Sequence, residues 1–506
     1  MNRNDSLDSE LRRQLARFAA RRTFLKHGAL SLGAIALQSL LRGEGRAQAA
    51  AGAGEAGGGA AAGASTARPL VPRSPPLPAR VKQVISIHLS GAPPQHDLFD
   101  WKPKLVQHHL QPCPEELLQG QRFAFIQGRP LLLGSPYRFA QHGQSGAWMS
   151  ELLPNLATVA DRLCIVRSMR TTEFNHAPAE LFLHTGDRNA GHPALGSWVT
   201  WGLGSENQDL PGFVVLVSGG TDPTAGKSVW SSGFLPSVHQ GVQCRSGKEP
   251  VFFLNDPAGM PRTTRRATLD ALNRLNELEH ATTRDPETLT RISQYELAFR
   301  MQQAVPEVMD LAKEEPATLE EYGAKPGVTS LASHCLLARR MVESGVRFVQ
   351  LFDWGWDVHG TSSGDDIVTQ LPMKCREMDR PVAALIRDLE RRGLLDSTLV
   401  IWGGEFGRTA MNEARGGSKF LGRDHHPHCF TMFLAGAGIK AGAQVGATDE
   451  LGWSITDTPI DVHDLQATLL HLLGFDPHRL SYPYLGLDQR LIGPAETPRV
   501  RHELLA

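Results

Sequence analysis

The chain has 506 residues and a formal net charge of −1 at pH 7, because its 52 Lys and Arg nearly balance its 53 Asp and Glu. This balance gives no general attraction for nucleic acid or for a membrane surface, and nothing after residue 49 is apolar and long enough to span a bilayer. Six cysteines are present with no CxxC pair, which excludes a zinc ribbon and a thioredoxin-type site.

The first 49 residues have the pattern of a twin-arginine signal peptide. Arg21 and Arg22 are followed by a spacer, Phe-Leu and Lys, then by a short apolar run over 29–41. Ala47-Gln48-Ala49 supplies the small residues that signal peptidase accepts. The alternative is an amphipathic helix that starts with two arginines. We expect export by the twin-arginine route, to the periplasm or the outside medium, of a protein that folds and loads its metal beforehand.

Residues 50–79 are rich in Ala and Gly and then in Pro and Arg. Such a segment buries too little apolar surface to order itself, so we expect a flexible linker. The folded part is expected over 80–506. We interpret it as one large domain with insertions, since no second linker follows.

Within that domain, strand and helix patterns alternate along the chain. Glycines at 345, 393 and 474 follow the helical stripes and are expected to end them. Alternating helices and buried strands predict an α/β fold, with a largely parallel sheet covered on both faces in three layers. We expect strands over 81–88, 164–166, 346–352 and 398–402, and helices over 331–342, 382–389 and 462–473.

Ligand sites in such sheets lie beyond the carboxyl ends of the strands. Polar clusters follow the predicted strands at 91–100, 173–179, 353–360 and 403–408, and a fifth cluster at 422–428 precedes the apolar run 429–435. Imidazoles and carboxylates suit zinc, manganese or iron, whereas all-oxygen sites suit calcium or magnesium. The clusters therefore predict a metal site. The alternative for an isolated residue such as His96 is an ordinary structural histidine.

The cluster at 173–179 has a second feature. Asn175 and Pro178 are typical of a helix start, and Gly186 of its end. The backbone N–H groups of such a start favour an anion, although an ordinary capped helix explains the same residues.

This helix carries a resemblance to the alkaline phosphatase and sulfatase superfamily. Sulfatases have Cys-x-Pro-Ser-Arg-x-x-x-Leu-Thr-Gly at this spacing, and Pro178, Thr185 and Gly186 match it. His176 stands where the nucleophilic Cys should be, so formylglycine chemistry is not available. The Ser, Arg and Leu are replaced by Ala179, Glu180 and His184.

Two further segments resemble sequences of the same superfamily. The run 398–407 resembles the superfamily strand that ends in Asp-His-Gly or Asp-Asn-Gly, with Glu405 in place of the Asp, and 461–474 resembles a late helix. The closest match is one branch, the domain of unknown function 1501 family, whose members are exported and sulfatase-like. The resemblance spans about residues 81–500. Its motifs include 97–100, 175–179, 211–214, 233–236, 355–359, 402–409 and 422–428.

The resemblance implies an alkaline phosphatase-like fold that holds one or two divalent metal ions, with zinc, manganese and calcium left open. It implies that Asp97 is the metal-binding carboxylate that follows the first strand. His88, at the end of that strand, is the alternative ligand. Arg408 and Arg423 are candidates for binding an anionic substrate, with surface ion pairing as the alternative. The other metal candidates are Asp357, His359, Glu405 and one or more of Asp424, His425, His426 and His428, some of which must act by orienting the ligands.

His176, with Asn175 and Arg408, is the candidate catalytic group. His176 is either a nucleophile or, as we prefer, a metal ligand, or else catalysis is lost. We expect an exported metallohydrolase of sulfate or phosphate esters, acting on a small-molecule or polysaccharide ester. The alternative is a non-catalytic, metal-stabilised protein that binds an acidic or sulfated polysaccharide.

Overall fold

The computed structural model describes residues 69–506, apart from residues 121–122, 246–249, 252–255 and 257–258. The predicted signal peptide over 1–49 and the first part of the predicted linker lie outside this range. Within the described residues, no helix has both the length and the apolar character needed to cross a membrane.

The last part of the predicted linker packs against the folded domain. Leu70 is buried in the main core, and the backbone N–H groups of Arg73 and Leu77 donate to the carbonyl oxygens of Leu203 and Gly474, each over 2.9 Å. Residues 69–79 of the expected linker thus pack against the domain. One leucine and several backbone hydrogen bonds are enough to hold this stretch on the domain surface.

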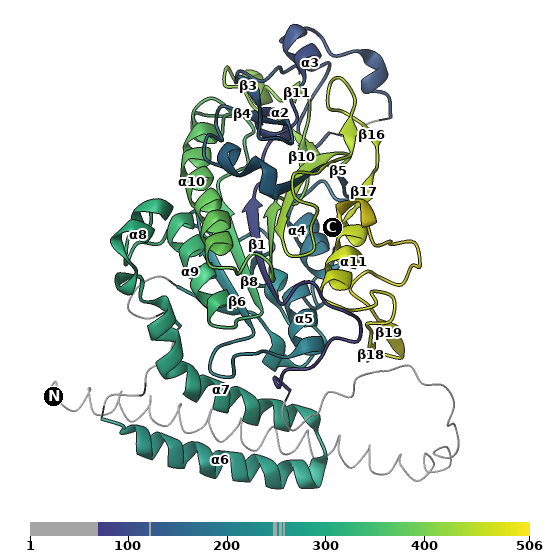
Figure 1. Ribbon diagram of the computed structural model, residues 1–506. Coiled ribbons are helices and arrows are strands. Elements are labelled where there is room, and N and C mark those ends of the chain that lie inside the picture. The colour runs from purple at the N-terminus through teal and green to yellow at the C-terminus, as the bar shows by residue number, and fades with distance from the viewer. Residues whose placement is uncertain (1–68, 121–122, 246–249, 252–255, 257–258) are drawn as a thin grey trace, which may run out of the picture. The chain divides into compact units, whose positions relative to one another are not determined.

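A nine-stranded sheet forms the centre of the domain (Figure 1). Its strands are parallel to their neighbours except β13, which runs antiparallel to both β5 and β9. The order is β14 (Gln444–Val445), β5 (Leu163–Arg170), β13 (Phe430–Gly436), β9 (Thr398–Gly403), β1 (Gln83–Ser90), β8 (Phe348–Trp354), β6 (Phe213–Ser218) and β7 (Val242–Cys244), with β17 (Ile460–Asp461) also paired to β5.

Side chains on the two faces of the sheet enter two separate hydrophobic cores. Alternate residues of β1, namely Ile85, Ile87 and Leu89, belong to one core, whereas Val84 belongs to the other. In β8, Val349 and Leu351 point to the first core and Phe348 and Phe352 to the second. This period of two explains why the predicted strands read as continuous apolar runs, since both faces are covered.

Helices cover each face and complete three layers (Figure 1). The helices α9 (Leu331–Glu343) and α10 (Gln370–Arg391) contribute to the first core, and α4 (His176–Thr185), α5 (Leu195–Leu203) and α11 (Val462–Leu472) to the second. Ser330 caps α9 by accepting a hydrogen bond from the Ser333 N–H, and Gly345 follows its end with a φ of +84°. The predicted three-layer α/β architecture is confirmed.

Two long helices were absent from the sequence prediction. They are α6 (Arg262–Thr283) and α7 (Pro286–Met309), which pack against each other, and α7 also contacts α9. The remaining elements are α2 (Gln95–Leu98), α3 (Pro103–Gln107), α8 (Pro316–Tyr322), β2 (Leu131–Leu132), β3 (Phe139–His142), β4 (Ala147–Ser150), β10 (Gly407–Arg408), β11 (Met411–Asn412), β12 (His425–His426), β15 (Ala447–Thr448), β16 (Ile455–Asp457), β18 (Tyr482–Tyr484) and β19 (Leu487–Gln489).

The register of the sheet fixes where the polar clusters meet. His88 of β1 lies opposite Phe352 of β8 and Gly403 of β9. Because the three strands are parallel, the segments that follow them leave the sheet at one edge. The loops that carry residues 353–360 and 403–408 are thereby brought next to the end of β1.

Candidate metal centre

Four side chains from three separate segments converge at this edge of the sheet. His176 is the first residue of α4, Asp357 and His359 follow β8, and His425 begins β12. One oxygen, Asp357 Oδ1, lies 3.2 Å from His176 Nε2, 2.8 Å from His359 Nε2 and 3.5 Å from His425 Nε2. Three imidazoles and a carboxylate whose donor atoms lie within 4.8 Å of one another form a donor set that suits a transition metal.

A second group adjoins the first and is buried. It consists of His88, Glu180 and Glu405, with side chains no more than 2 % exposed. His88 Nε2 lies 3.2 Å from Glu405 Oε2 and 4.0 Å from Glu180 Oε1. These three atoms have no aligned hydrogen bond among the described residues. Buried polar atoms without such partners are costly, and a cation between them would satisfy all three.

His176 connects the two groups. Its Nδ1 lies 2.5 Å from Glu405 Oε1, and its Nε2 faces Asp357. The same Glu405 oxygen accepts a hydrogen bond of 3.0 Å from the backbone N–H of Gly91. Both ring nitrogens of His176 are thus directed at carboxylates of the centre, and one residue borders both groups.

Second partners orient the imidazoles. His425 Nδ1 lies 2.7 Å from the carbonyl oxygen of Phe174, and when it donates there, the lone pair of Nε2 points to the centre. His359 Nδ1 pairs with Glu413, whose other oxygen lies 2.5 Å from Arg415 Nε. Glu413 therefore fixes the ring of His359 in the same way.

The electrostatic environment couples these groups. Burial lowers the pKa of His176, but hydrogen bonds and charges from Asp357 and Glu405 outweigh it and raise the pKa to about 9. Burial raises the pKa of Asp357, but Arg408 and the imidazoles hold it well below its usual range. Burial and the neighbouring charge of Glu405 raise the pKa of Glu180 to about 7, whereas burial lowers that of His425 to about 4. Without a cation, His176 carries the compensating proton.

Three further predicted residues, Asp97, Arg408 and Arg423, form buried ion pairs. Asp97 makes a bidentate pair with Arg423, at 2.7 and 3.1 Å, and belongs to neither donor group. Arg408 is fully buried and donates to Asp357 and to the carbonyl oxygens of Gly91 and Ala92. Asp97 and Arg423 thus satisfy each other inside the protein, and Arg408 is engaged by Asp357 and backbone carbonyl oxygens. His88 takes the place expected for Asp97.

The 422–428 cluster contributes two ligand candidates: His425 in the first group, and Asp424, which lies with His359 and Glu413 in a third buried group of possible ligands. His426 Nε2 lies 2.7 Å from the carbonyl oxygen of Trp453, and His428 is exposed to solvent. Asp424 accepts hydrogen bonds from the backbone N–H groups of Phe125, Ile126 and His425, at 2.8, 3.0 and 2.7 Å. It thereby braces the loop at Phe125, whose ring contacts His359 and His425. His426 and His428 belong to no donor group of the described residues, whereas Asp424 does and also accepts three backbone hydrogen bonds.

Asn175 occupies the N-cap position of α4, but its exposed side chain makes no cap hydrogen bond. Sequence reasoning left out Glu180 and Glu413. Glu180 had a signal, because it lies four residues after His176 on one predicted helix and so on the same face. Glu413 lies in no motif, and only the fold places it behind His359.

No curated protein matches the chain. Three similar solved structures are the lipoteichoic acid synthase LtaP from Listeria monocytogenes (11 % identity, TM-score 0.35, 82 % of this chain and 75 % of that chain), the PsFucS1 sulfatase from Pseudoalteromonas sp. (12 %, 0.34, 83 % and 74 %) and a protein in the alkaline phosphatase superfamily from Vibrio parahaemolyticus (12 %, 0.33, 85 % and 74 %).

The family comparison covers most of the chain. The model of a protein family of unknown function, DUF1501, matches residues 81–504. This range includes the nine-stranded sheet and every residue of both donor groups. The chain therefore belongs to the DUF1501 family, as its motifs predicted.

Proposed function

We propose that this protein is an exported, metal-dependent hydrolase of sulfate or phosphate esters that holds one or two divalent cations. One observation carries the proposal: His176, Asp357, His359 and His425 converge around one carboxylate oxygen, next to the buried His88, Glu180 and Glu405. No purely structural role accounts for seven ligand-type side chains gathered at the edge of the sheet where α/β proteins place their ligands.

The donor chemistry assigns the roles of the residues. The first group would hold a cation through three imidazoles and Asp357, and the second would hold one through His88 and the two glutamates. A bound divalent cation supplies Lewis-acid polarisation of an ester oxygen. Asp357 also pairs with Arg408, which donates to the carbonyl oxygens of Gly91 and Ala92. Arg408 thereby links the loop after β8 to the turn after β1.

Between the two roles open to His176, the geometry favours the ligand. Both of its nitrogens are directed at carboxylates, Glu405 on one side and Asp357 on the other. A nucleophile needs one nitrogen free to approach the ester. When a cation replaces the proton held between His176 and these carboxylates, the imidazole becomes a neutral donor.

One observation favours the second candidate, a non-catalytic metal-stabilised protein that binds an acidic or sulfated polysaccharide. Arg408 and Arg423, the arginines expected to contact the anionic group, are engaged inside the protein. This candidate predicts the same metal content and no turnover.

Elemental analysis tests the metal site. We expect wild-type protein, purified without chelator, to contain about one or two transition-metal equivalents. His425→Ala should lose metal, whereas His428→Ala, in which an exposed imidazole three residues away is removed, should retain it. A metal-free wild type, or equal loss in both variants, would contradict the proposed centre.

Turnover is measured separately on the metal-loaded protein. With Zn²⁺ or Mn²⁺, the wild type should release 4-nitrophenol from 4-nitrophenyl sulfate or 4-nitrophenyl phosphate, and His176→Ala should lose both metal and activity. Retained metal with lost activity would instead make His176 the nucleophile. A loaded protein that is silent across a broad ester panel would favour the non-catalytic candidate.

A further inference from the structure

A large cavity opens beside the first donor group. It has a volume of about 900 Å³ and is lined by the ends of β6 and β8 and by α9 and α10. Asp357 and His359 form part of its wall, so the cavity is continuous with the candidate metal centre. Pockets of about 300–1,000 Å³ typically enclose whole organic ligands. The space exceeds what a sulfate or phosphate group needs, so it has room for the organic part of an ester.

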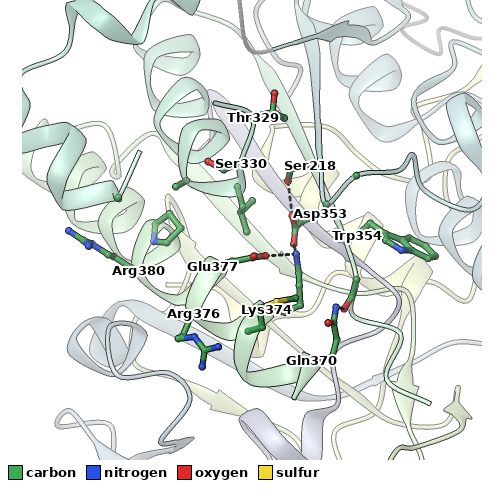
Figure 2. A pocket seen from close by; sticks show the side chains of 18 of the residues that line it. Ser218, Thr329, Ser330, Asp353, Trp354, Gln370, Lys374, Arg376, Glu377 and Arg380 are labelled. Carbon is green, nitrogen blue, oxygen red and sulfur yellow. Dashed lines mark hydrogen bonds and ion pairs between the residues drawn. The ribbon is translucent and has the colours of Figure 1, made fainter. Parts of the chain in front are cut away.

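A buried ion pair forms one wall of this cavity (Figure 2). Lys374 Nζ lies 2.7 Å from Asp353 Oδ2 and 2.9 Å from Glu377 Oε2, and the Ser218 hydroxyl donates to Asp353 Oδ1 over 2.7 Å. The Trp356 N–H donates to Asp353 as well. Because these groups satisfy one another, the pair shapes the cavity and its lysine is not a free binding site for an anion.

Other lining groups are available to a ligand. Trp354 and Arg380 lie on opposite sides of the Asp353–Lys374 pair in Figure 2. The Trp354 side chain is partly exposed, and within the described part of the chain its indole packs on no other aromatic ring. Arg376 is exposed and has no ion pair with any described residue, whereas Arg380 is paired with Glu320. The cavity thus offers a flat apolar surface and one uncommitted guanidinium.

The polar and charged lining restricts the kind of ligand. Four carboxylates face three cations around the cavity, so a densely anionic polymer would be repelled. Carboxylates, the Thr329 hydroxyl and the Gln370 amide would lose their hydration against an acyl chain. The same groups match a ligand rich in hydroxyls, which both donates and accepts hydrogen bonds while a ring face covers the indole.

We propose that this cavity binds the sugar ring of a sparingly charged saccharide monoester, with Trp354 stacking on the ring and Arg376 donating to its polar substituents. The inference rests on the proposed hydrolase function, because the ester group would then lie at Asp357 and His359. Trp354 and Arg376 are specificity-determining residues in this arrangement, and neither belongs to any of the possible metal-ligand groups.

The test compares two classes of ester on the metal-loaded, full-length protein. Trp354→Ala and Arg376→Gln should each lower kcat/KM for N-acetylglucosamine 6-sulfate or glucose 6-phosphate at least tenfold, and change it less than twofold for methyl sulfate or methyl phosphate, which carry no ring to stack on the indole. Trp101→Ala is the matched control, because the Trp101 ring packs against Trp148 outside the cavity. This control variant should leave kcat/KM unchanged for both classes of ester. Equal losses on both classes, or no loss on the sugar esters, would overturn the proposal.

A binding measurement separates this proposal from the hydrolase function. If the wild type turns over neither class of ester, titration calorimetry with the same sugar esters still tests the saccharide site. Binding that is lost in Trp354→Ala and retained in Trp101→Ala would support this site. The hydrolase proposal alone would then fail. No binding at millimolar sugar ester overturns the saccharide site. A preference for thymidine 5′-(4-nitrophenyl phosphate) that depends on Trp354 also overturns it, in favour of a nucleobase.

Discussion

His176 lies between the Asp357 and Glu405 carboxylates, and this position predicts how stability depends on pH in the metal-free protein. Its pKa rises from 6.5 to about 9 in the folded state, which corresponds to about 3 kcal/mol. The folded state binds the proton more tightly, so the stabilisation is complete below pH 6.5 and is lost as the pH rises through about 9.

Urea unfolding of chelator-treated wild type and His176→Gln checks this prediction. The difference between their unfolding free energies should fall by about 3 kcal/mol between pH 6 and pH 9.5. Saturating Zn²⁺ should remove that fall, because a ligated imidazole carries no proton to lose. A pH-independent difference in the metal-free protein would show that His176 is not protonated between the carboxylates.

We expect Glu413 to act by orienting the imidazole of His359. Because it pairs with His359 Nδ1, Glu413→Gln should weaken zinc binding roughly 10- to 100-fold, as measured by competition with a chromogenic chelator. Glu390→Gln is the control, since Glu390 forms a surface pair with Arg162. Wild-type affinity in the Glu413 variant would mean that the carboxylate does not orient the imidazole.

At the scale of elements, the turn after β1 and the loop after β8 approach each other so closely that only glycine fits. Gly91 has a φ of +109°, and a Cβ there would lie 2.4 Å from the backbone nitrogen of Asp357. Gly91→Ala should therefore displace the segment that carries Asp357 and His359, lowering metal content and Tm together.

Gly393→Ala is the matched control for that substitution. Gly393 follows α10 with a φ of +67°, and an added Cβ would meet no atom within 4 Å. It should cost about 1 kcal/mol of backbone strain and leave metal content unchanged. Equal metal content in both alanine variants would show that the close approach at Gly91 does not position the centre.

At the scale of the whole molecule, the sequence predicts export through the twin-arginine route. Arg21→Lys combined with Arg22→Lys should leave the precursor in the cytoplasm, as shown by fractionation and immunoblotting. The same double substitution should leave metal content unaltered, because the donor groups all lie after residue 87. Normal delivery of the variant across the membrane would refute the signal.

The folded domain was largely predictable because its pattern is local. Strands β1, β8 and β9 and the helices α9 and α11 follow from apolar runs and stripes closed by glycine. Helix α10 extends twelve residues before its predicted start at Val382, because Lys374 and Asp379 are buried with polar partners and interrupt the stripe. Helices α6 and α7 were missed for a related reason: α6 buries very few of its side chains.

For the candidate site, the sequence by itself determined the family, the α/β class and the segments that supply the ligands. Motifs placed His176, Asp357, His359, Glu405 and His425 among the candidates, because each follows or precedes a strand. The motifs did not show which of His425, His426 and His428 lies in the first donor group. They also did not show whether Asp97 or His88 lies in the second. Residues adjacent in sequence can face opposite ways, and only the sheet register and the surrounding packing set their directions.

The tertiary structure decided the partners. It pairs Asp97 with Arg423, turns Arg408 toward Asp357, and brings Glu180 and Glu413 behind the imidazoles. It also opens the cavity beside Asp357, with Trp354 and Arg376 in its wall. A metal-type donor set depends on distances of a few ångströms between residues far apart in the chain, such as His88 and Glu405, whose side chains lie 3.2 Å apart. Composition and spacing carry no such distances, because chain folding alone sets them.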